Sequence, residues 1–564
     1  MEDNENNSRN VPGANQSANM YSYNNDQQQS QIKETDAIRR SLGEMNPNAI
    51  QNEEYINNVN QNNEVVNPNA VVIEIDQSPP LYWMFFLVFG IIQIVFIILL
   101  ANYYYWDELN YPGENNKDKN EEDNGKNKLA KEMIEKYYKS FQDINVMIFL
   151  GFGFLRAILK HHSWFAISIT LLAGILSIEF GLFAMICWSS ILRQSWYNGL
   201  FNFRYLLDSN YCAAATIIAM GAIFGKLYFA QYIVMILSST VFSTLNYTLI
   251  RQKIHCIDTG GALTVHLFGA IFGAFFTFIC FYPKEERERI KKSPHLAKNY
   301  YSVLFSFIGT VILVSYWPSF NTGLIEGNPK YRGIINTYFS IGGSIIGTFM
   351  VTSVLHQRKF KVEDIINSSF AGGIAISGCC SIIRSFYLSI VFGIIAGALS
   401  SSLFYSLNDK LTKIGYHDTS GILYYHGIPG LLGGILSTIF VGCLANWDYN
   451  KSELDNNRHE LYMSLIDEFL PKEFAYNITK LYKRDDNISI GTRAWIQFGC
   501  IFLTIVIAGV TGLFSGFLIK FCNCEIAKRY FNDSEFFDVS DNEPFPWEDE
   551  EIKIKLKYHS DNKK

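Results

Sequence analysis

The sequence predicts an all-α membrane protein with twelve transmembrane helices and a 5+5 inverted-topology repeat. Two observations carry the helix prediction. Of the 564 residues, 49% are hydrophobic and only 18% are charged. The apolar residues gather in long uninterrupted runs, each near the roughly 20 residues that a helix needs to cross a bilayer. A soluble domain needs no such series of runs, and the strands of a membrane β-barrel would alternate apolar with polar residues.

Two polar tails flank the predicted membrane domain. Residues 1–80 are rich in Asn and Gln and poor in apolar residues, which is typical of a disordered segment. Residues 522–564 form the second tail. The chain shows no cleavable signal peptide at its start, so we expect its first apolar run to act as a retained signal anchor. The transmembrane channel domain is therefore predicted over 81–521.

The predicted helices comprise an extra first helix, two repeats of five helices at about 144–282 and 300–444, and a last helix. They lie at roughly 82–103, 144–160, 164–189, 211–227, 229–250, 261–282, 300–317, 333–355, 366–383, 386–406, 421–444 and 494–521.

Lys and Arg in the short loops predict the orientation. The loops 282–298 and 356–364 are basic and follow the sixth and eighth helices. Basic loops stay in the cytoplasm, which places both chain termini there and the long loop 445–493 outside. That loop carries three N-x-S/T sequons, as an outside loop can. They begin at Asn450, Asn477 and Asn487.

One motif occurs twice. "DTGGALTVHLFG" begins at Asp258 and "DTSGILYYHGIP" begins at Asp418, and each Asp precedes a histidine by eight positions. These histidines are His266 and His426, so the whole pattern repeats at an offset of 160 positions. Five predicted crossings separate the two helices, so they run in opposite senses. This is the pattern of an inverted repeat, in which a substrate path lies between the halves.

The position of each motif in its helix suggests roles for its residues. An Asp just before a membrane helix accepts bonds from free N–H groups, and we expect Asp258 and Asp418 to start their helices in this way. Eight residues of helix rise about 12 Å, so entry from opposite faces of a roughly 30 Å core brings His266 and His426 together near the midplane. Ionisable residues at that depth are functional candidates. Glycines follow each histidine and fit either close helix packing or a narrow lumen.

The chemistry of two neutral imidazoles favours a small neutral permeant. A cation at mid-membrane costs at least about 2.5–3.5 kcal/mol, and we expect no deep acidic side chain to offset it. Neutral imidazoles can hydrogen-bond to one another and guide a neutral molecule such as ammonia, or relay a proton. We expect no cofactor and no metal, because zinc would need a third protein ligand. "CNC" at 522–524 is a weak metal signal. An enzyme is disfavoured, since no nucleophile and base pair is evident.

Several motifs resemble the ammonium transporter/Rhesus glycoprotein family, and its Rhesus branch in particular. The similarity runs from about 137 to 521. It is carried by "KSFQDINVMIFLGFGFL" (139–155), "MGAIFGK" (220–226), "DTGGALTVHLFGAIFG" (258–273), "YWPSFN" (316–321), "INTYFS" (335–340), "AGGIA" (371–375) and "HGIPGLLGG" (426–434). The resemblance implies a homotrimer with one ammonia pore per subunit, in which His266 and His426 are the family's twin pore histidines. We expect the protein to lie in the plasma membrane.

The resemblance also implies an outer gate of two stacked aromatic rings. Its second ring maps to Phe320, and its first maps to Tyr211, where Rhesus proteins usually have Phe. A second departure follows "STLN", where Rhesus proteins often have Glu and this chain has Tyr247. An acidic outer vestibule that gathers ammonium is therefore not expected.

The sequence leaves three functions open. The first is a channel for ammonia, recruited as ammonium, with methylammonium as a further substrate. The second is a dual ammonia and carbon dioxide channel, which the same apolar lumen would permit. The third is a non-conducting membrane scaffold or ammonium sensor, against which the twin histidines argue. Apart from the lipid bilayer, these transported molecules and a homotrimer are the expected partners, with no nucleic acid.

Overall fold

The computed structural model describes residues 79–106, 131–194 except 132, 199–281, 290–443 except 292 and 326, 490–521, and residues 531, 533 and 537. The expected disorder of the N-terminal tail, the three sequons and "CNC" lie outside the described residues. The first elements are α3 (Pro79–Tyr103), β1 (Tyr104–Trp106), η3 (Ile134–Tyr138), α5 (Lys139–Val146), η4 (Met147–Gly151), α6 (Phe152–Leu155), α7 (Ser163–Arg193), β2 (Gly199–Phe201), α8 (Phe203–Met220), α9 (Phe229–Tyr247), η5 (Thr248–Lys253), η6 (Ala262–Leu267) and α10 (Phe268–Cys280).

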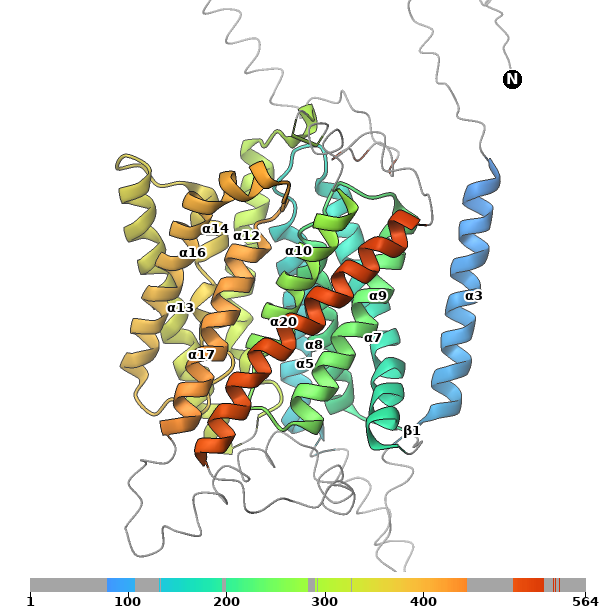
Figure 1. Cartoon of the computed structure of the whole chain (residues 1–564), viewed down its shortest axis with the longest axis horizontal. Helices are drawn as coiled ribbons and strands as arrows, with labels where there is room; N and C mark the ends of the chain where they lie inside the picture. The colour runs from blue at the N-terminus through green and yellow to red at the C-terminus, as the bar shows by residue number, and fades with distance from the viewer. Residues whose placement is uncertain are drawn as a thin grey trace, which may run out of the picture. The chain divides into compact units, whose positions relative to one another are not determined.

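The second half of the chain continues the helical series. Its elements are η7 (Pro294–Leu296), α12 (Tyr300–Thr322), α13 (Gly327–Leu355), α14 (Val362–Ser368), α15 (Ala371–Ala375), α16 (Phe386–Ile414), η8 (Leu423–Gly427), α17 (Ile428–Cys443) and α20 (Ile490–Phe521). The strands β1 and β2 pair in parallel over three residues each. Figure 1 shows α20 crossing the ribbon beside α10 and α17, both of which it contacts.

Eight helices of the described chain are long and apolar enough to cross a membrane. They span 163–192, 229–253, 262–280, 300–322, 327–355, 386–414, 423–443 and 491–520. Each corresponds to one of the twelve predicted helices. A shorter apolar stretch, 89–102, lies within α3, where the extra first helix is predicted. The described part of the chain is thus that of an all-α membrane protein, with two short strands beside its helices.

The remaining three predicted helices differ in form. The segment 144–160 is helical only to residue 155 and changes hydrogen-bonding pattern at η4. The helix predicted at 211–227 begins eight residues earlier, where the Asn202 side chain accepts from the amides of Arg204 and Tyr205, and it ends at Met220. The segment 366–383 is not one helix, because α14 and α15 are short and turns follow to residue 383. Apolar composition alone therefore overstates its helical length.

The non-helical backbone of 376–383 is held by polar side chains of other segments. Asn336 Nδ2 donates to the carbonyls of Cys380 at 2.8 Å and Ile383 at 2.7 Å. Thr259 Oγ1 donates to the Ser377 carbonyl at 2.6 Å. Irregular backbone is tolerated at membrane depth only where protein satisfies it, and these bonds meet that requirement.

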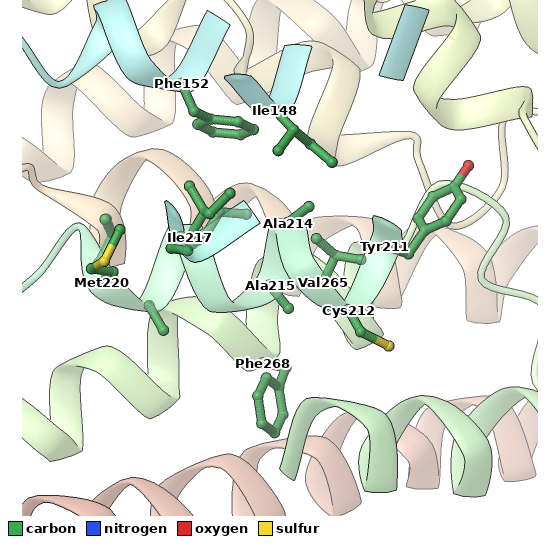
Figure 2. Close-up of a cluster of buried hydrophobic side chains, with 14 of the residues drawn as sticks. Ile148, Phe152, Tyr211, Cys212, Ala214, Ala215, Ile217, Met220, Val265 and Phe268 are labelled. Carbon is green, nitrogen blue, oxygen red and sulfur yellow. The ribbon is translucent and has the colours of Figure 1, made fainter. Parts of the chain in front are cut away.

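The centre of the domain is built around α8, whose side chains from Leu207 to Met220 are all buried. In Figure 2, Ile148 and Phe152 lie on one side of α8 and Phe268 lies on the other. These side chains belong to one buried cluster. The helix α8 therefore packs between the η4–α6 segment and α10. The helix α10 directly continues η6, the turn that contains His266.

The glycines after the two histidines serve helix packing. A Cβ on Gly269 would lie 2.6 Å from the Ala215 carbonyl oxygen, and one on Gly273 would lie 2.4 Å from that of Ala219. A Cβ on Gly430 would lie 2.8 Å from the Ala262 oxygen. Such distances leave no room for any side chain, so these three glycines let backbones approach closely.

The expectation that no acidic side chain lies deep in a helix is wrong. Glu179 lies in the middle of α7, and its Oε2 accepts from Gln93 Nε2 of α3 at 2.8 Å. One residue on, Phe180 stacks on Phe96 of α3 with ring centroids 4.7 Å apart. The hydropathy of the predicted helix 164–189 does not reveal Glu179, because a single acid does not interrupt an apolar run. Its partner is α3, and it therefore binds the first helix to α7.

Part of the C-terminal tail docks against the start of α7. The Asp533 carboxylate accepts from the amides of Trp164 at 3.0 Å and Phe165 at 2.8 Å, both in the first turn of that helix. The Phe531 amide donates to the Gly225 carbonyl at 2.9 Å. Burial lowers the pKa of His162 to about 3, so its ring is neutral and its 3.8 Å contact with Asp533 is not an ion pair.

The carboxyl of Asp533 is expected to favour docking of this tail more strongly as pH falls. Burial raises the pKa of Asp533 to about 6, although three backbone N–H groups act against the shift. A carboxyl whose pKa is higher when docked binds protons more tightly in that state, so Asp533 by itself should make docking about tenfold more favourable at pH 5 than at pH 7.5. The buried ring of His162, whose pKa is lowered, acts in the opposite direction wherever undocking exposes it.

Hydrogen–deuterium exchange of the Trp164 and Phe165 amides, corrected for the intrinsic pH dependence, measures this equilibrium. Asp533→Asn is the matched control, because it keeps the shape without the charge. Between pH 7.5 and pH 5 the natural chain should gain about tenfold more protection than this variant, since His162 acts equally in both chains. The same change of corrected protection in both chains would contradict the prediction.

Candidate functional site

The two helices that carry His266 and His426 begin with the same local structure. Asp258 accepts from the amide of Leu263, five residues on, at 3.2 Å, and from that of Thr264 at 2.9 Å. Asp418 likewise accepts from the amide five residues on, that of Leu423, at 3.1 Å. These bonds satisfy free N–H groups at a helix start. The same five-residue separation therefore occurs at both copies of the motif.

A glycine in the left-handed region precedes each of these helices. Gly261 has φ +75° and Gly421 has φ +67°. A residue with a Cβ adopts this conformation only at a cost. Both following turns, η6 and η8, have the wider π-helical form. Such turns often mark functional positions, and here they contain the two histidines.

His266 and His426 meet inside the protein. Their Nδ1 atoms lie 3.3 Å apart, with ring centroids 5.5 Å apart and ring planes within 18°. Each residue is 1% exposed. A hydrogen bond between two Nδ1 atoms needs one donor and one acceptor. The neutral pair therefore shares a single proton across this contact.

The shared proton determines what the other ring nitrogens offer. The ring that donates from Nδ1 leaves its Nε2 as an acceptor, whereas the ring that accepts carries a proton on its Nε2. His266 Nε2 is buried and has no hydrogen-bond partner. A buried polar atom without a partner is costly. A molecule that both donates and accepts hydrogen bonds would satisfy such a pair.

Aromatic rings surround both imidazoles. Trp317 stacks on His266, with centroids 5.7 Å apart and planes at 21°. Phe370 lies 5.4 Å from the His426 ring and Phe152 lies 6.0 Å from it. Trp317 and Phe370 also stack on each other at 5.2 Å. Of these three rings, only Trp317 belongs to a motif that contains a predicted site residue, Phe320. Periodicity does not distinguish Phe152 and Phe370 from packing residues.

The predicted gate residues lie together next to His266. The rings of Tyr211 and Phe320 are 4.7 Å apart and tilted by 45°, and Phe320 lies 5.9 Å from the His266 ring. The Tyr211 hydroxyl donates to the backbone carbonyl of Phe320. That carbonyl is in the last turn of α12, where intrahelical donors run out. The hydroxyl therefore ties the first ring to the backbone of the second.

A buried charged cluster behind Tyr211 was not predicted. Arg251 lies in η5, with its guanidinium carbon 4.8 Å from the Tyr247 ring centroid and 5.8 Å from that of Tyr211. The Tyr247 hydroxyl donates to the carboxylate of Asp208 in α8. In the sequence, Asp208 stands just before one predicted helix, and Tyr247 and Arg251 stand at the end of the next. Only the fold brings these three side chains to one place.

The described part of the chain contains no set of side chains that is arranged to bind a metal ion. There, no group of three or more His, Cys, Asp or Glu side chains is placed to hold a metal ion. The two histidines contact aromatic rings and each other.

Comparison with known proteins gives a consistent family. Residues 124–526 match the Ammonium Transporter Family. Ammonium transporter Rh type C of Xenopus laevis is 33% identical over 331 residues, which cover 57% of this chain and 67% of that protein. Ammonium transporter Rh type C of Oryctolagus cuniculus is 30% identical over 423 residues, covering 73% and 82%.

Solved structures show the same fold. The Rh50 protein of Nitrosomonas europaea, described as one of the Rhesus family of channels, superposes with a TM-score of 0.58 at 23% identity, covering 77% of this chain and 99% of that one. A sensor Amt protein superposes with a TM-score of 0.54 at 16% identity, covering 71% and 96%. With the family match extending over well more than half its length, the chain belongs to the Ammonium Transporter Family, as a Rhesus-type integral membrane member.

Proposed function

We propose that the protein is a channel that conducts ammonia, recruited as ammonium, through an apolar pore lined by His266 and His426. The single observation that carries this proposal is the 3.3 Å contact of their Nδ1 atoms inside a shell of aromatic rings. The proposal includes the gate pair Tyr211 and Phe320, and helix-start roles for Asp258 and Asp418. It also includes twelve helices, a homotrimer in the plasma membrane, and both termini in the cytoplasm.

A neutral permeant fits this pore better than a cation. Cations deep in a membrane are stabilised by acidic side chains or carbonyl groups. The histidine pair contacts the rings of Trp317, Phe320, Phe370 and Phe152. Glu179 is engaged by Gln93 of α3. Ammonia both donates and accepts hydrogen bonds, as the two Nε2 atoms require.

The matched starts of the two pore helices support the inverted repeat. Asp258 and Asp418, Gly261 and Gly421, and the two histidines each correspond at an offset of 160 positions. Each pair also shares its local backbone structure. Two segments with one local structure that run in opposite senses would bring their histidines together at the centre of the membrane, which accounts for the contact.

The test is flux into proteoliposomes. An inward gradient of ammonium chloride should raise the internal pH faster with the natural protein than without it, because ammonia takes up a proton inside. The double variant His266→Ala/His426→Ala should lose about 10- to 100-fold of this protein-dependent rate, since two hydrogen bonds of roughly 1 kcal/mol or more are removed. Methylammonium uptake should fall in parallel.

Two controls make this flux test decisive. His295→Ala changes a histidine in the loop before α12 and should conduct as the natural protein does. Equal, near-background flux with the natural protein and the double variant would overturn the channel and favour a scaffold or sensor. A carbon dioxide flux that alone responds to the double variant would favour the gas channel instead.

The Tyr211 hydroxyl is expected to restrain the gate. Tyr211→Phe removes the bond to the Phe320 carbonyl, which is worth about 1 kcal/mol net. Ammonia flux should therefore rise roughly two- to fivefold if the gate opens by separating these rings. The matched control is Tyr232→Phe, because the Tyr232 hydroxyl is also buried and donates to a backbone carbonyl, that of Ile223, at 3.1 Å. Unchanged flux in Tyr211→Phe would show that the tether does not limit conduction.

A further inference from the structure

The two tyrosines that depart from the Rhesus pattern share one neighbour. Arg251 places its guanidinium carbon within 5.8 Å of the Tyr211 ring centroid and 4.8 Å of the Tyr247 ring centroid. A guanidinium within about 6 Å of an aromatic centroid is attracted by the ring. The departures in sequence are therefore parts of one structural unit, which we name the Arg251 cluster: Tyr211, Tyr247, Arg251 and Asp208.

The Arg251 cluster is fully inside the protein. Tyr211 is 0% exposed, Tyr247 is 2% and Arg251 is 7%. Arg251 Nη1 is buried without a hydrogen-bond partner. An arginine keeps its charge in such surroundings. A permanent positive charge therefore lies directly against a ring of the gate pair.

Two acids lie near Arg251 and offset part of its charge. Asp208 and Asp258 are the carboxylates that act on it, and Arg204 acts in turn on Asp208. Asp208 is engaged by the Tyr247 hydroxyl, and Asp258 is engaged by the amides of its own helix. Hydrogen bonds hold both carboxylates to other groups but leave them charged. At Tyr211 the electrostatic effect of Arg251 is nevertheless larger than that of Asp208.

We infer that Arg251 is a specificity-determining residue of the pore, one that repels ammonium at the gate and leaves ammonia as the species that passes. The inference rests on the proposed channel function. A cation that enters the gate approaches a fixed like charge in a medium of low dielectric, where such repulsion is strong. Ammonia carries no charge and is unaffected. Where an acid would attract the cation, this chain presents Tyr247 backed by a guanidinium.

The test separates cation from gas in the same proteoliposomes. Ammonium current under voltage reports the cation, and the rise of internal pH reports ammonia. Arg251→Met keeps the length of the side chain and removes its charge, so the ratio of current to ammonia flux should rise about tenfold. Arg251→Lys keeps the charge and should retain the natural ratio. Lys253→Met is the matched control, since Lys253 lies two residues on and donates to the Leu192 carbonyl.

A second variant keeps the inference falsifiable if the first does not fold. Removing one member of a buried charge pair leaves the other uncompensated, so Asp208→Asn/Arg251→Met removes both charges together and should raise the ratio as well. A ratio that stays at the natural value in both Met variants, while ammonia flux persists, would overturn the role of Arg251. Absence of ammonia flux in the natural protein would instead overturn the proposed channel.

Discussion

The contact between His266 and His426 constrains the rest of the membrane domain. Two Nδ1 atoms can share a proton at 3.3 Å only if both helices bring their rings to one level. The two ring planes here lie within 18° of each other. Each helix must then start at a defined residue, which the carboxylates of Asp258 and Asp418 secure by accepting amides of the first turn. The close approach of α10 to α8 depends in turn on Gly269 and Gly273, which leave room for the α8 backbone. The helix starts and the helix packing therefore both hold His266 and His426 in contact.

The non-helical segments persist inside the membrane domain because protein side chains, in place of water, hydrogen-bond to their backbone groups. Hydrocarbon offers no hydrogen bonds, so each break in a helix needs a protein partner. Asn336 supplies two donors to the turns after α15, and Asn321 Nδ2 donates to the Gly373 carbonyl at 2.9 Å. Tyr211 supplies one at the end of α12. The same side chains that satisfy the backbone thereby hold the aromatic shell of the pore in place.

The sequence allowed the histidine pair and its helix starts to be predicted because that information is local. Asp258, Gly261 and His266 lie within nine positions, and the repeat doubles the signal. The breaks at 376–383 were not predicted, because apolar residues form helices and buried turns alike. The environment of Arg251 could not be predicted either. Its partners Tyr211 and Asp208 are about 40 positions away, and only the packing of α8 against α9, which η5 continues, brings them together.

The proposed gate combines two requirements that oppose each other. Its rings must be held closely enough to exclude water and ions, which the Tyr211 hydroxyl favours by binding the Phe320 backbone. They must also separate for each molecule that passes. A hydrogen bond of about 1 kcal/mol is weak enough to break thermally and strong enough to bias the closed arrangement. Arg251 adds a constraint of a different kind, because its charge acts on the permeant whether the rings are together or apart. A gate held by the Tyr211 hydrogen bond can therefore open often without admitting ammonium. The rate of ammonia conduction need not fall for the pore to select ammonia over ammonium.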